Sequence, residues 1–128
     1  MSRCYIATDP DGGVHLRETA SRTYSHAVLV HALHWSDDRE YLTEHADYLE
    51  RVGQSPERVA AARAKAAAAT NRRQWLLVGF CGRLDLAQKT AAEMVTHRKP
   101  GDRVEIAEAV EVSRIHYTAA KKANKEAR

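Results

Sequence analysis

The sequence has few of the residues that mark a secreted or membrane-bound protein. Its 128 residues include only two cysteines, Cys4 and Cys81, which lie far apart along the chain and in no CxxC motif. We therefore expect free thiols in a reducing compartment. The first ten residues lack the apolar core of a signal peptide, and no apolar run approaches the length of a membrane span. Together these absences predict a cytoplasmic protein without membrane contact.

Motifs for nucleophilic catalysis and for phosphate binding are also missing. Before Cys81, Gly79 stands where the first glycine of a nucleophile elbow would be, but the second glycine of that motif is absent. Residues 11–13 lack the lysine and the following helix of a phosphate-binding loop. We therefore expect no enzymatic activity and no cofactor.

Neither the histidines nor the glutamates have the spacing of a metal or catalytic site. His26 and His31 would point to opposite faces of one strand, whereas a zinc site needs three or four converging ligands. His26 as a general base would need a positioned partner, and the sequence identifies none. Three glutamates would not all share one strand face: Glu105, Glu108 and Glu111. We expect no bound metal.

The surplus of positive charge is small, with 20 Lys and Arg against 17 Asp and Glu and a net charge of +3. Nucleic-acid-binding proteins often show a stronger and more clustered excess. One interpretation is a solvated surface with a cationic tail. The alternative is a protein that binds nucleic acid through phosphate contacts. The residues that would make these contacts are Arg72, Arg73, Lys121, Lys122 and Lys125.

Five segments predict the strands of a mainly antiparallel sheet: residues 3–8, 14–17, 22–33, 74–83 and 103–112. The first two flank a turn rich in Pro, Asp and Gly, so they are expected to form a hairpin. The third and fourth contain continuous apolar runs typical of central strands, with Val30 and Leu77 in the core. The last alternates, with a bulge or strand end expected at Glu108.

A long helical stretch, residues 36–73, interrupts this pattern of strands. Asp37 and Glu40 match a capping box at its start, and Gly53 suits the end of a first helix. The Ser-Pro pair at 55–56 opens a second helix, which is nearly all alanine. Because it has few large apolar side chains, we interpret this insertion as a helical hairpin used for recognition or assembly.

The predicted fold class is α+β, with elements in the order β-β-β-α-α-β-α-β. It consists of a mainly antiparallel sheet, one packed helix capped by Asp85, and the inserted helical hairpin at 36–73. Residues 1–117 would form a single domain, and residues 118–128 a basic C-terminal tail. Large apolar side chains cluster in only a few runs, so we expect a modest core, for which a homodimer is plausible.

Two segments resemble a pattern in small accessory proteins of actinobacterial phages and prophages. They are residues 22–28 (RTYSHAV) and residues 82–89 (GRLDLAQK). In those proteins an RxYxHAVV-like strand is followed, after a variable insertion, by a strand that ends in an xRxDLAxKA-like helix start. The resemblance implies a non-enzymatic protein that binds host machinery or nucleic acid, and no active-site residue carries over from it.

From these features we expect the chain to bind a host protein through its helical hairpin. Trp35 and Trp75 bracket the insertion, so they either pack on each other to fix it to the sheet or provide an exposed aromatic anchor. Tryptophan is enriched at the binding hot spots of protein interfaces. The expected partner-binding residues are Trp35, Tyr41, Tyr48, Arg58 and Arg63.

Overall fold

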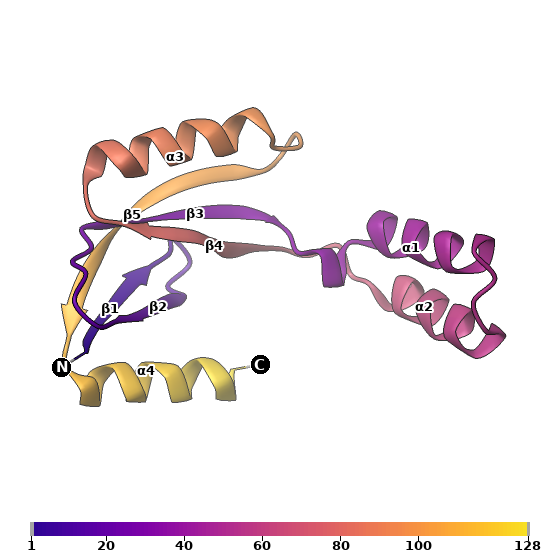
Figure 1. Cartoon of the computed structure of the whole chain (residues 1–128), viewed down its shortest axis with the longest axis horizontal. Coiled ribbons are helices and arrows are strands. Elements are labelled where there is room, and N and C mark those ends of the chain that lie inside the picture. The colour runs from indigo at the N-terminus through magenta and orange to yellow at the C-terminus, as the bar shows by residue number, and fades with distance from the viewer. Residues whose placement is uncertain (1, 128) are drawn as a thin grey trace. The chain divides into compact units, whose positions relative to one another are not determined.

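The computed structural model describes residues 2–127, which form a five-stranded sheet and four α-helices (Figure 1). Residues 2–31 and 75–127 make up one unit, called the sheet unit below, and residues 32–74 make up a second, the hairpin unit. The elements in chain order are β1 (Arg3–Thr8), β2 (Val14–Thr19), β3 (His26–Leu33), the 3-10 turn η1 (Trp35–Asp37), α1 (Arg39–Arg51), α2 (Pro56–Ala68), β4 (Arg73–Cys81), α3 (Leu84–Thr96), β5 (Arg103–Val112) and α4 (Arg114–Glu126).

The strand order in the sheet is β2-β1-β5-β3-β4, and neighbouring strands are antiparallel. The predicted α+β class and antiparallel sheet are therefore confirmed, as is the hairpin of β1 and β2. β5 pairs with β3 through residues 103–108 and with β1 through residues 109–112. The strand curves as it passes from one partner to the other (Figure 1), so the two halves of the sheet diverge along it.

The prediction of a bulge or a strand end at Glu108 is wrong. Glu108 pairs directly with His26, and the amide of the next residue, Ala109, donates a hydrogen bond to the Ser25 carbonyl at 2.9 Å. The strand then continues to Val112. A charged residue is tolerated at this position because the side chain of Glu108 is exposed where β5 changes partner strands.

The core of the sheet unit is centred on β3. Ala27, Val28, Leu29 and Val30 are all buried, which confirms that this strand is covered on both faces. α3 packs on β5, whereas α4 packs on β1 and β2 (Figure 1). Burial on this scale stabilises the fold because each large aliphatic side chain removed from water contributes about 1.5–3 kcal/mol.

β4 differs from the prediction because it lies at the edge of the sheet and not at its centre. Leu77, expected in the core, is 39% exposed, whereas Trp75 on the same strand is buried. An apolar run by itself does not distinguish a central strand from an edge strand whose faces are partly covered by other elements.

The C-terminal segment, predicted as a basic tail, is a helix that packs on the sheet. α4 starts at Arg114, four residues before the predicted tail, and runs to Glu126; the predicted end at Arg128 lies outside the described residues. Ser113 caps the helix by accepting from the amide of His116 at 3.1 Å. The helix packs on β1 and β2, and its Tyr117 is buried. The predicted boundary after residue 117 therefore falls within one continuous helix.

Two predicted helix caps are shifted. Asp38, and not Asp37, caps α1 by accepting a hydrogen bond from the amide of Tyr41 at 3.2 Å. The cap of α3 is the backbone of Arg83, and Asp85 instead forms an ion pair with that arginine at 3.2 Å. The predicted start of α2 is confirmed, because the Ser55 side chain caps the helix.

Candidate functional site

The base of the hairpin unit is held by Asp37. Its carboxylate accepts hydrogen bonds from the Thr70 amide at 2.7 Å, the Thr70 hydroxyl at 2.6 Å and the Arg72 amide at 2.9 Å. Its backbone carbonyl accepts from the amide of Asn71, whose φ is 55°. Asn is one of the few non-glycine residues that adopt this left-handed conformation readily. Asp37 therefore joins the start of α1 to the chain that leaves α2, which explains why it is not free to cap α1.

The hydrogen bond from the Thr70 hydroxyl, followed by those from the Thr70 and Arg72 amides, lowers the pKa of Asp37 below its ordinary value of 3.8. The ionised carboxylate therefore stabilises the hairpin at every pH above 3.8. This contribution is lost as the pH falls further, through the lowered pKa of the folded state.

Replacing Asp37 with asparagine should loosen the base of the hairpin at neutral pH, because an amide nitrogen then faces backbone N–H donors. In hydrogen–deuterium exchange, the amides of Thr70 and Arg72 should exchange faster in the variant, and amides of the sheet unit should not change. The difference from the native protein should shrink below pH 3.8. Equal exchange rates at pH 7 would show that the Asp37 contacts do not hold the hairpin together.

The interior of the hairpin unit is thin. α1 and α2 pack mainly through small side chains, with Leu42, Ala46, Ala66 and Ala69 buried. Alanines bury little apolar area, so the contact between the two helices covers few of the larger side chains of α1. Tyr41 and Tyr48 of α1 consequently remain exposed.

An exposed aromatic surface results on η1 and α1. Trp35 is 60% exposed, Tyr41 48%, Tyr48 50% and Val52 49%. Trp35 and Tyr41 contact each other edge to face with their ring centroids 6.3 Å apart. Tyr41 and Tyr48 are seven residues apart, or two helical turns, so they lie on one side of α1. We call these four residues the aromatic surface.

The two tryptophans that bracket the insertion have different environments. Trp35 is the most exposed member of the aromatic surface, whereas Trp75 is buried in the sheet unit beside His31 and Arg103. The indole nitrogen of Trp75 donates a hydrogen bond to Asp11 at 3.1 Å. Trp75 therefore has a structural environment, and Trp35 has the exposure that an aromatic anchor requires.

The two arginines predicted to bind a partner are engaged within the hairpin. Arg63 of α2 forms ion pairs with Asp47, at 3.0 Å, and with Glu50, both on α1. Arg58 donates a hydrogen bond to the side chain of Gln54 at 2.9 Å. These contacts are exposed to solvent, so their contribution to stability is small, but they occupy the guanidinium groups that were expected to meet a partner.

The basic residues predicted to bind nucleic acid fall on both units. Arg72 and Arg73 lie at the end of the hairpin unit, and the Arg72 amide is bonded to Asp37. Lys121, Lys122 and Lys125 lie on α4 of the sheet unit and are exposed. Neither unit by itself brings all five residues together.

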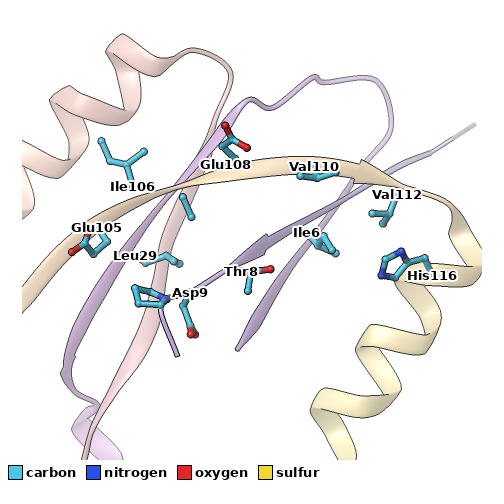
Figure 2. Close-up of a pocket in the computed structure, with 12 residues that line it drawn as sticks. Ile6, Thr8, Asp9, Leu29, Glu105, Ile106, Glu108, Val110, Val112 and His116 are labelled. Carbon is cyan, nitrogen blue, oxygen red and sulfur yellow. The ribbon is translucent and has the colours of Figure 1, made fainter. Parts of the chain in front are cut away.

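A cavity of about 510 Å³ lies beside β5, at the point where the strand leaves β3 and joins β1 (Figure 2). Its lining is mostly aliphatic, with Ile6, Ile106 and Val110, and two glutamates, Glu105 and Glu108, lie at it. Glu105 is paired with a neighbouring arginine on β5. Thr8 and His116 also line this cavity.

Asp9 also lies at this cavity, but its carboxylate is already engaged. It accepts hydrogen bonds from the amides of Asp11 and Gly13, each at 2.9 Å, and contacts the ring of His15 at 2.9 Å. These bonds shape the turn between β1 and β2. Within residues 2–127, no group of three or more His, Cys, Asp and Glu side chains is placed to hold a metal ion.

No protein-family model, curated protein or solved structure matches this chain. Over the part of the chain that the structure describes, no helix is both long enough and apolar enough to cross a membrane. Cys4 is buried, Cys81 is partly buried, and both are free thiols.

Proposed function

We propose that this chain is a non-enzymatic, cytoplasmic binding protein of the phage accessory type, and that it binds a host protein through the aromatic surface of its hairpin unit. The observation that carries the proposal is the exposure of Trp35, Tyr41 and Tyr48 on a unit that has few large side chains of its own. Free thiols at Cys4 and Cys81 fit a reducing compartment.

Aromatic side chains suit this role for a physical reason. Each Trp or Tyr buries 150–250 Å² when covered, roughly, and its polar atom can still find a hydrogen-bond partner at an interface. A few such residues typically dominate the binding free energy. Left in water, the same rings give the hairpin no comparable stabilisation, so a partner that covers them would gain most of this energy.

The charge of the hairpin unit favours a protein partner over nucleic acid. Residues 32–74 contain seven Asp and Glu and seven Arg and Lys, so the formal charge of the unit is zero. Nucleic-acid binding depends on an excess of cations that neutralises phosphates. A neutral surface with exposed aromatic rings depends instead on apolar burial, which is the main favourable term in protein association.

The experiment is affinity capture from a lysate of the natural host, with mass spectrometry as the readout. The test variant combines Trp35→Ser, Tyr41→Ser and Tyr48→Ser. The matched control removes exposed apolar side chains from the sheet unit, with Val95→Ser and Ile115→Ser, which are 62% and 83% exposed in the native protein. Circular dichroism checks that both variants are folded.

We expect one host protein to be enriched by the native chain and by the control, and to be reduced at least tenfold with the test variant. Equal enrichment by the test variant would contradict the proposal. The second candidate function is nucleic-acid binding through the exposed lysines of α4, and nuclease treatment of the lysate distinguishes it from the first. Capture that depends on nucleic acid is lost after this treatment, whereas capture by the aromatic surface persists.

A further inference from the structure

The two edge strands of the sheet line one opening. β2 and β4 stand at opposite ends of the strand order, yet both contribute to a cavity of about 480 Å³ together with the last turns of α4. The sheet is therefore curled so far that its edges approach each other. The residues that line the opening are Val14, His15, Leu16, Leu77, Lys121, Asn124 and Lys125.

Side-chain contacts bound this opening at both ends. At one end, Trp75 of β4 donates its indole hydrogen bond to Asp11, which lies just before β2. At the other end, the ring of Tyr24 packs against Phe80 of β4 with centroids 5.6 Å apart, and Arg17 of β2 lies near the hydroxyl of Tyr24. An additional strand could not run along the whole seam without breaking these contacts, so the opening suits a small molecule and not an extended peptide.

The rim of the opening is positively charged. Lys121 and Lys125 are one helical turn apart on α4, and both are exposed. Among residues 2–127, neither donates a hydrogen bond or forms an ion pair within contact distance, although Lys121 lies close enough to Glu18 to attract its carboxylate. No carboxylate lines the cavity. The nearby Glu18 is already held by two bonds from Arg114, at 3.1 and 2.7 Å. The two ammonium groups are therefore available to an anionic group that lies between them.

The floor of the opening is aliphatic and fixed. Its apolar surface is provided by Val14, Leu16 and Leu77, and Leu77 is 39% exposed. Asn124 donates a hydrogen bond to the Val14 carbonyl at 2.7 Å, which positions the end of α4 against the edge of β2. The lining contains no Phe, Tyr or Trp ring on which a nucleobase could stack.

We propose that this opening binds a small anionic amphiphile, such as a medium-chain fatty carboxylate. The acidic headgroup lies between the ammonium groups of Lys121 and Lys125, and the hydrocarbon chain lies against Leu16 and Leu77. The volume is within the range of about 300–1,000 Å³ that is usual for small-molecule sites. The site uses only residues of the sheet unit and is independent of the aromatic surface.

The test is isothermal titration calorimetry of the full chain with decanoate at a concentration where it stays monomeric. We expect saturable binding of one decanoate per chain and no binding of decyltrimethylammonium, which has the same chain and the opposite charge. The double variant Lys121→Glu and Lys125→Glu should weaken binding at least tenfold. The control Lys122→Glu, on the same helix but outside the lining, should bind as the native protein does.

Three results would overturn the proposal: no heat of binding at millimolar decanoate, equal binding of the cationic amphiphile, or native affinity in the double variant. If the double variant is unfolded, NMR of the native protein decides. Decanoate should then shift the methyl signals of Leu16 and Leu77. Shifts confined to the cavity at Ile106 and Val110 would show that decanoate binds there instead. Displacement of decanoate by a short oligonucleotide would show that the lysines bind nucleic acid.

Discussion

Replacing Leu29 with alanine should lower the free energy of unfolding by about 2–5 kcal/mol, the range found when a buried leucine is truncated in a core that cannot fully collapse. Leu29 has no exposed surface, and its neighbours in β3, Val28 and Val30, are also buried. The strand pairs with β5 through residues 26–31, so the backbone has little freedom to close the resulting cavity. Denaturant unfolding followed by circular dichroism measures the change.

The matched control is Leu77→Ala on the neighbouring edge strand β4. The same atoms are removed, but Leu77 is 39% exposed, so the loss should be less than about 1 kcal/mol. The difference between the two variants reports burial alone, because the chemical change is identical. A loss at Leu77 equal to that at Leu29 would show that Leu77 is buried in the core, as the apolar run of β4 predicted.

Gly13→Ala should destabilise the protein by about 1–3 kcal/mol, through a clash and the loss of hydrogen bonds. A Cβ at this position would lie 2.4 Å from Oδ2 of Asp9. The Asp9 carboxylate is buried and holds the amides of Asp11 and Gly13 and the ring of His15. It cannot move aside without breaking some of these bonds. Thermal unfolding should show the loss as a lower Tm.

Gly79→Ala provides the comparison for this variant. A Cβ at Gly79 would meet no atom within 4 Å, so the substitution should change stability by no more than about 0.5 kcal/mol. If Gly13→Ala and Gly79→Ala have the same Tm, Asp9 is free to reorient and the turn between β1 and β2 does not depend on its hydrogen bonds.

Local signals in the sequence were sufficient for much of the fold. The Pro- and Gly-rich turn predicted the β1–β2 hairpin, the apolar run of β3 predicted a buried strand, and the Ser55-Pro56 pair predicted the start of α2. Each of these features is decided by residues close together in the chain, where turn, capping and periodicity rules apply directly.

Features that depend on distant residues were not predictable. The edge position of β4 depends on pairing across the whole sheet, and Leu77 on this edge strand is partly exposed. The sequence of α4 predicts a solvated basic segment. In the structure the helix packs on β1 and β2, and its Arg114 binds Glu18 of β2. Asp37 looked like a helix cap, and its real partners are Thr70 and Arg72, more than thirty residues away.

The candidate site was predicted only in part. Aromatic residues at 35, 41 and 48 stood out because the rest of the insertion is small or charged, and the structure leaves them exposed. The two ion pairs of Arg63 with α1 could not be predicted from the sequence, since the acidic residues are 13 and 16 residues away. The opening between β2 and β4 had no sequence signal, because its three contributing elements meet only through the curl of the sheet.

The central claim is that a host protein covers the aromatic surface of the hairpin unit. Hydrogen–deuterium exchange with mass spectrometry, on the full chain with and without the captured partner, tests it most directly. The account predicts slower exchange in residues 35–52, with little change in peptides from the sheet unit. Slower exchange confined to residues 2–31 and 75–127, with residues 35–52 unchanged, would contradict it.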